Sequence, residues 1–401
     1  MEAHLLEWLN LVIRWVHVIV GIAWIGASFY FVWLENNLDR QVKNQHLAGE
    51  LWAIHGGGIY HLQKYKLAPA TMPKHLHWFK WEAYSSWISG VLLLSVVYYL
   101  NAATYLILPG SPVSPAAGVA IGLGSLLIGW YVYDLLCKSA LRHQPLLLGV
   151  ALMVFLVLVA WGFSQFMTGR AAYLHVGAVI GTMMVGNVFF IIMPAQRSLV
   201  GAIEAGTAPD PALPKNGLLR SRHNNYLTLP VIFIMVSSHF PSTYGHEWSW
   251  AILLGLSLVS VAVRHYFNTR HNSQQFLWAL PAAVLALLVM AYVTVPQAPG
   301  SSTVKASPKA EVEAPVTAQQ AHDIVATHCA TCHSATPSHA AFSAAPAGLM
   351  FDSIDEIKRY KDRIYLQSVA SRIMPLGNST GMTQDERDQL GRWIADGANT
   401  Q

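Results

Sequence analysis

Eight apolar runs dominate the sequence and restrict its fold more than any other feature. Each is near the roughly 20 residues that an α-helix needs to cross a bilayer. Only 11% of the 401 residues are charged, whereas an ordinary soluble domain is nearer one quarter charged. The candidate spans are residues 8–33, 83–100, 116–137, 145–163, 172–193, 225–240, 249–267 and 275–295. The pattern therefore predicts an all-α fold, an eight-span transmembrane helical bundle in a lipid bilayer.

Positive charge is distributed unevenly over the loops between these runs. Fourteen Lys and Arg lie in residues 34–82, 138–144, 194–224 and 264–274, whereas the opposite loops hold one, Arg170. Cytoplasmic loops carry an excess of Lys and Arg, so the basic loops are predicted to be cytoplasmic. Both termini are then predicted to lie outside, in the periplasm of a bacterial inner membrane. The net charge of +4, without a long basic run, argues against nucleic acid as a partner.

Two details of the runs bear on their number. The first ten residues hold no Lys or Arg, so the first run is expected to remain a span rather than to be cleaved as a signal peptide. The sixth run is the weakest, because it is short and Pro230 interrupts it. Eight spans place both termini on one side, in agreement with the charge distribution.

The polar end of the chain carries one specific motif, Cys329-Ala-Thr-Cys332-His333. C-x-x-C-H is the attachment sequence of a c-type haem, in which two thiols bind one porphyrin and the histidine reaches the iron. A zinc site would need a second ligand pair, and a thioredoxin-like site would need a surrounding βαβ pattern. The motif therefore predicts a covalent haem c. Because bacteria attach this haem in the periplasm, the motif independently places the C-terminus outside.

Composition divides the chain into three parts. Residues 1–295 hold the apolar runs and form the predicted transmembrane domain. Residues 296–315 are rich in Pro, Ser and Ala and are predicted to be a flexible linker. Residues 316–401 are polar and are predicted to be a small soluble domain.

The order of motifs in this soluble domain resembles the class I cytochrome c family. A short helix is expected before the haem motif, a Met374-Pro pair follows it, and Thr383-x-x-Glu386 is a capping box that opens a final helix. The resemblance implies that His333 and Met374 are the axial ligands of the haem iron. Methionine is a soft donor that raises the haem potential, which suits an electron acceptor. The alternatives to Met374 are Met350 and Met382.

Three histidines within the outer parts of different spans, His17, His175 and His239, form a second candidate site. Ionisable side chains inside a membrane are costly and usually functional. Two neutral imidazoles can hold a non-covalent haem b, or another metal, between helices. Arg14 and Arg170 are expected at a similar depth. The alternative is that each histidine only hydrogen-bonds a neighbouring helix.

A cluster of donors and acceptors, Arg220-Ser-Arg-His-Asn-Asn-Tyr226, precedes the sixth span on the predicted cytoplasmic side. A positive anchor in a cytoplasmic loop accounts for the arginines. The cluster could also line a polar pocket for a small planar anion, with Arg222, His223 and Asn224 as weak catalytic candidates.

Three stretches, residues 15–35, 181–190 and 223–239, resemble the bacterial membrane-bound urate oxidases, also called urate hydroxylases. That family joins an eight-span membrane domain to a cytochrome c tail. The resemblance implies a catalytic membrane domain that converts urate to 5-hydroxyisourate, the first step of urate breakdown, with electrons passed to the c-type haem. It also implies a respiratory-chain acceptor, such as a terminal oxidase or a soluble cytochrome. It supplies no urate-contact residues.

Two other classes of protein fit the same parts. One is a cytochrome c-containing electron-transfer subunit of a respiratory chain that has no substrate chemistry. The other is a transporter with a redox tail. A closed polar pocket near a redox centre would favour the enzyme, and a solute path across the membrane would favour the transporter.

Overall fold

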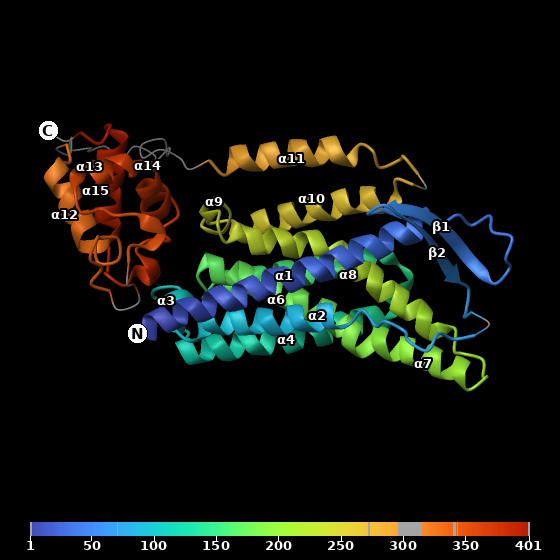
Figure 1. Ribbon diagram of the computed structural model, residues 1–401. Helices are drawn as coiled ribbons and strands as arrows, with labels where there is room; N and C mark the ends of the chain where they lie inside the picture. The colour runs from blue at the N-terminus through green and yellow to red at the C-terminus, as the bar shows by residue number, and fades with distance from the viewer. Residues whose placement is uncertain are drawn as a thin grey trace.

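The computed structural model describes residues 2–69, 71–271, 273–295, 315–339, 342 and 344–399. Long helices lie side by side in a bundle, and a smaller helical unit, the C-terminal tail, sits at one end of it (Figure 1). The N-terminus lies at this same end. The predicted linker falls almost entirely on residues 296–314, outside the described residues.

Five helices are long and apolar enough to cross a membrane, as expected of a multi-pass membrane protein. They are α1 (Glu2–Asn37), α4 (Pro115–Lys138), α5 (Pro145–Ser164), α10 (Ser249–Thr269), and the continuous run of α6 (Gly169–Gly186), the π-helix η3 (Asn187–Ile192) and α7 (Met193–Glu204). The run that begins with α6 is central, because 61% of its most apolar window is buried, against at most 28% in the other four.

The three remaining predicted spans are also helical, but they are shorter or more polar. They are α2 (Trp81–Leu94) continued by the π-helix η1 (Ser95–Tyr99), α8 (Ala212–Ser237), and α11 (Ala279–Val293). Pro230 does not interrupt α8, contrary to the reading of the sixth run. The helix begins well before this run, so the cluster around His223 is helical rather than a loop.

The all-α prediction is wrong for the basic loop after α1, which forms a β-hairpin. Strand β1 (Leu47–His55) pairs antiparallel with β2 (Gly58–Tyr65). The two turn residues, Gly56 and Gly57, both have positive φ, which a type I′ turn of a two-residue hairpin requires. The hairpin lies at the end of the bundle opposite the tail (Figure 1).

Short helical segments connect the long ones. They are α3 (Ala102–Tyr105), η2 (Ala140–His143) and α9 (Pro241–Tyr244). Segments α3 and α9 lie at the tail end of the bundle (Figure 1).

The tail has its own hydrophobic core. Its elements are α12 (Ala318–His328), η4 (Pro346–Gly348), α13 (Ile354–Arg359), α14 (Lys361–Ile364), η5 (Tyr365–Ala370), η6 (Leu376–Asn378) and α15 (Gln384–Ala395). Val325, Ile357, Leu390 and Trp393 are almost fully buried among them. A capping box on Thr383 and Glu386 opens α15, as the sequence predicts.

Candidate functional site

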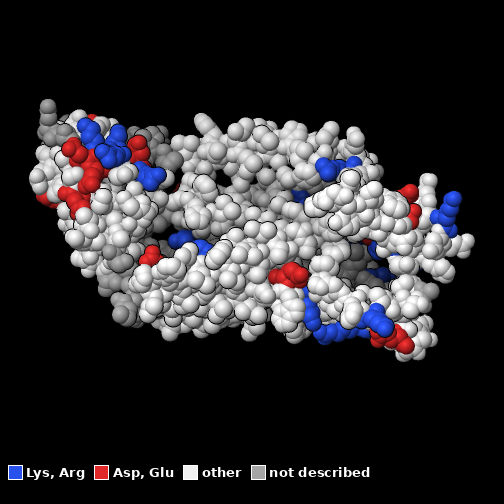
Figure 2. All heavy atoms as spheres, in the orientation of Figure 1, with Lys and Arg blue, Asp and Glu red and all other residues white. Residues whose placement is uncertain are grey.

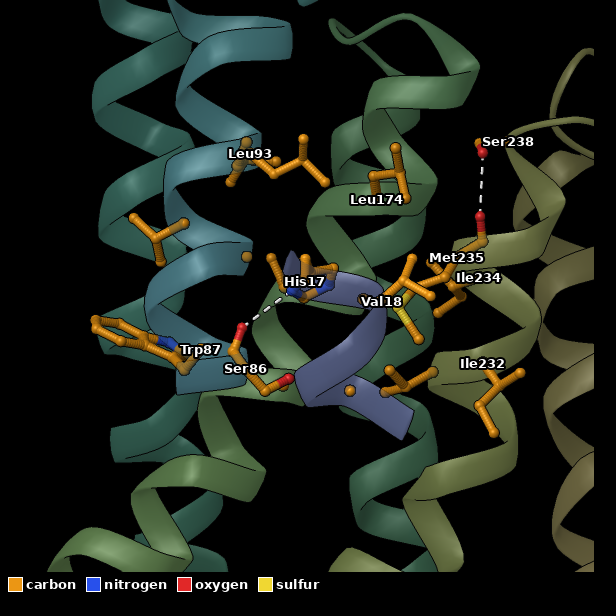
Figure 3. Close-up of a pocket in the computed structure, with 18 of the residues that line it drawn as sticks. His17, Val18, Ser86, Trp87, Leu93, Leu174, Ile232, Ile234, Met235 and Ser238 are labelled. Atoms are coloured by element: carbon orange, nitrogen blue, oxygen red, sulfur yellow. Dashed lines mark hydrogen bonds between the residues drawn. The ribbon is translucent and has the colours of Figure 1, made fainter. Parts of the chain in front are cut away.

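A cavity of about 690 Å³ lies among α1, α2, α6 and α8. Its size is within the range typical of small-molecule and cofactor sites. Most of its wall is apolar, and Figure 3 shows His17 of α1 between Ser86 of α2 and Met235 of α8. Its ionisable lining residues are Arg14, His17, Tyr98, Arg170 and His239.

His17 is oriented by α2. Its Nδ1 lies 3.1 Å from both the Ser86 carbonyl oxygen and the Ser89 hydroxyl. Gly90 makes room for the ring, because a Cβ there would lie 3.1 Å from His17 Cε1. A proton on Nδ1, donated to the Ser86 carbonyl, leaves Nε2 as a lone-pair donor. His239, which follows α8, lines the same cavity, so two of the three predicted histidines share one site.

His175 does not join them. It is fully buried, its Nδ1 lies 2.8 Å from the Ala171 carbonyl oxygen, and its Nε2 lies 3.0 Å from the Tyr99 hydroxyl. The ring packs against α4, where a Cβ on Gly122 would lie 2.9 Å from Nε2. Both ring nitrogens are therefore occupied, and His175 has the structural role that the sequence left as the alternative. Across the described ranges, no group of three or more His, Cys, Asp and Glu is placed to hold a metal.

The weak catalytic candidates His223, Asn224 and Arg222 lie toward the opposite end of α8. His223 and Asn224 form hydrogen bonds within the bundle, and Arg222 faces outward. His223 Nδ1 lies 2.9 Å from the Tyr133 hydroxyl. The side-chain oxygen of Asn224 accepts from Asn187 at 2.8 Å, and its amide donates to the Met184 carbonyl. Arg222 is exposed, as expected of a charged anchor.

Sequence reasoning missed the most buried charge of this region, Arg220. Its side chain is fully buried and donates to Asp134 Oδ1 at 2.6 Å and to Asn187 Oδ1 at 3.2 Å. A signal existed, because Asp134 is a lone acid in the third apolar run, and such a charge requires a partner.

The C-x-x-C-H motif lies in the tail, where its two cysteines and its histidine differ in burial and in hydrogen bonding. Cys329 is buried and Cys332 is half-buried. The Nδ1 of His333 lies 3.0 Å from the Leu349 carbonyl oxygen, so a proton on Nδ1 leaves Nε2 for iron. Burial lowers the pKa of His333, which keeps the imidazole neutral, as metal binding requires. Burial also raises the pKa of Cys329 to about 12, so this thiol lacks the thiolate character of a redox-active cysteine.

The three candidate methionines, Met350, Met374 and Met382, differ in their exposure and in how their backbone is held. Met382 is 3% exposed and packs inside the tail core, whereas Met350 is 37% exposed. Met374 is half-buried, and its backbone is fixed on both sides. Its N–H donates to the Gln367 carbonyl at 2.9 Å, and its carbonyl accepts from Arg387 at 2.7 Å.

The loop that carries Met374 lies against the tail end of the bundle. A Cβ on Gly377 would lie 2.9 Å from the Thr104 carbonyl oxygen of α3. Ile373 packs against the hydrophobic core of the bundle. Burial raises the pKa of Tyr105, the neighbour of Thr104; the charge of Cys332 in the haem motif raises it further, and that of Arg170 at the cavity lowers it. The haem motif and the cavity therefore approach each other across α3.

Replacing Gly377 with valine is expected to weaken this contact, because overpacking of a closely packed site costs about 1–3 kcal/mol. Hydrogen exchange of α3 and α9 should become faster. Gly381→Val is the matched control, since Gly381 also has positive φ but a Cβ there would meet no atom within 4 Å. Equal exchange in the two variants would contradict the contact.

Fold and site together define a class, a mostly helical multi-pass membrane protein with a cavity between helices and a helical tail that carries C-x-x-C-H. A family model described as the urate oxidase N-terminal domain matches residues 3–295, and the chain belongs to this family. No curated protein and no solved structure matches the chain. The family match spans the whole helical bundle and ends before the tail.

Proposed function

We propose that the membrane domain oxidises urate to 5-hydroxyisourate and that the electrons pass to a c-type haem held by the tail. The match of the bundle to the urate oxidase family is the observation that carries the substrate. The C-x-x-C-H motif, which lies outside the matched residues, supports the acceptor.

The reaction balances with water as the oxygen source. Urate is an electron-rich planar anion near neutral pH. Loss of two electrons makes its C5 electrophilic, and addition of water there releases two protons. A c-type haem would supply a one-electron acceptor, so two transfers are needed in each turnover. A respiratory-chain acceptor, such as a terminal oxidase or a soluble cytochrome, would restore the oxidised state.

Four residues of the tail would hold this haem. The thiols of Cys329 and Cys332 would form the thioether links, and His333 and Met374 would be the axial ligands. The hydrogen bond from His333 Nδ1 to Leu349 supports the proximal assignment, because it leaves the other ring nitrogen for iron.

The charge distribution supports an orientation with both termini outside the cytoplasm. The middle of the molecule carries few charges; Lys and Arg lie at the end that holds the hairpin and α7, and at the other end they lie on the tail, mixed with Asp and Glu (Figure 2). Cytoplasmic ends are enriched in Lys and Arg, so the tail would lie in the periplasm of a bacterial inner membrane.

The test is the absorbance of the c-type haem in isolated membranes that contain the protein. Addition of urate is expected to reduce the haem band, and membranes from cells that express Cys329→Ala/Cys332→Ala should show no urate-dependent change. The outcome that contradicts the proposal is a haem that ascorbate reduces but urate does not. That result would favour an electron-transfer subunit without urate chemistry.

A further inference from the structure

Parts of the wall of the cavity among α1, α2, α6 and α8 are flat, because glycines on these helices face the cavity. Gly21, Gly26 and Gly181 line it, and a Cβ added to any of the three would meet no atom within 4 Å. Glycine faces on membrane helices allow close approach of another helix or of a flat group. No described helix fills this space, so the walls suit a flat apolar molecule that is much larger than urate.

Two arginines lie at the cavity without an acidic partner. Among the described residues, Arg14 and Arg170 form no ion pair with Asp or Glu, and Arg14 donates only to Asn10, at 3.0 Å. Both side chains are half-buried, and charges that are partly removed from water are usually paired, because an uncompensated charge is costly. A ligand that carries carboxylates would supply the missing negative charge.

Two buried polar atoms near the same arginines lack hydrogen-bond partners. They are the Tyr98 hydroxyl and the Arg170 Nε, and both side chains line the cavity. Leaving a buried donor unpaired costs about 1–3 kcal/mol. An acceptor on a bound molecule would remove this cost, and carboxylate oxygens are the acceptors that arginine binds best.

We infer that this cavity binds a non-covalent haem b, with His17 and His239 as iron ligands and with Arg14, Arg170 and Tyr98 around its two propionate carboxylates. The glycine-lined walls accommodate the porphyrin faces, and the imidazole of His17 presents Nε2 because its Nδ1 bonds to α2. His175 is not a ligand, since both of its nitrogens are occupied. Binding of haem b in this cavity does not depend on urate being the substrate.

The test is the haem content of the purified full-length protein. Acidified organic solvent removes non-covalent haem and leaves thioether-linked haem on the chain. We expect one extractable b-type haem per chain in the wild type, and its loss from His17→Ala and from His239→Ala, while the covalent haem remains. His143→Ala, at an exposed position outside the cavity, is the matched control and should retain both haems.

Two further variants separate a ligand site from a folding defect. Imidazole added to His17→Ala should restore the b-type spectrum, which a misfolded protein would not allow. Gly181→Leu keeps both histidines but fills the cavity, and it should also lose the extractable haem. Covalent haem alone in the wild type, or extractable haem that survives in His17→Ala and His239→Ala, would overturn the assignment. Both results are independent of whether urate reduces the c-type haem, so the two proposals can fail separately.

Discussion

Replacing Met374 with alanine is expected to abolish the methionine–iron charge-transfer band of the haem proposed for the tail and to lower its reduction potential. A thioether is a soft ligand that raises the potential of c-type haems, so its loss favours the ferric state. The backbone hydrogen bonds to Gln367 and Arg387 hold Met374 in place. Absorbance of the oxidised protein and a redox titration measure the two effects, and urate-dependent reduction of the haem should weaken in parallel.

The two other methionines of the tail provide the controls. Met350→Ala should leave both the band and the stability unchanged, because this side chain is exposed. Met382→Ala should keep the band but destabilise the tail by about 2–5 kcal/mol, as for other large-to-small substitutions in a core. If the band survives in Met374→Ala and disappears in either control, the sixth ligand has to be reassigned.

The sequence was sufficient where local rules decide the structure. Run length and hydropathy predicted the helices of the bundle, and the Thr383–Glu386 capping box marked the start of α15. The predicted depth in the membrane was enough to group His17 with His239. His175, which the same depth suggested, does not line the cavity, because depth does not determine which neighbour a helix face contacts. In the structure that face of α6 packs against α4, where Gly122 leaves room for the ring.

The basic cluster on α8 shows a second limit of sequence reasoning. The sequence pattern predicts both Arg220 and Arg222 to be cytoplasmic anchors, and it offers only Arg222 as a weak catalytic candidate. Both lie on α8. Residues two positions apart on a helix are rotated by about 200° around its axis, so their side chains point to nearly opposite sides. Arg220 therefore faces the bundle and is fully buried, whereas Arg222 faces outward. The hairpin was missed for a different reason, since the Gly56-Gly57 turn signal lay within a segment interpreted only as a cytoplasmic loop.

Replacing Asp134 with alanine is expected to destabilise the bundle by about 3–5 kcal/mol, the usual cost of removing one partner of a buried ion pair. Arg220 would keep its charge, and only Asn187 would remain as a hydrogen-bond partner for its guanidinium group. Thermal unfolding in detergent, followed by far-ultraviolet circular dichroism, should show a lower transition temperature. The tail haem spectrum should not change, because this pair lies at the opposite end of the bundle from the tail.

Two comparisons decide whether the loss comes from the uncompensated Arg220. Lys138 also contacts Asp134, at 2.6 Å, but its side chain is 63% exposed, so Lys138→Gln should cost no more than about 1 kcal/mol. The double variant Asp134→Leu/Arg220→Met removes both buried charges and should be more stable than Asp134→Ala, because apolar replacements of buried pairs are often neutral. A double variant as unstable as Asp134→Ala would mean that the pair is needed for more than mutual neutralisation. The hydrogen bond from Arg220 to Asn187, and through it the contacts to Tyr133 and Asn224, would then be the interaction that holds α4, η3 and α8 together.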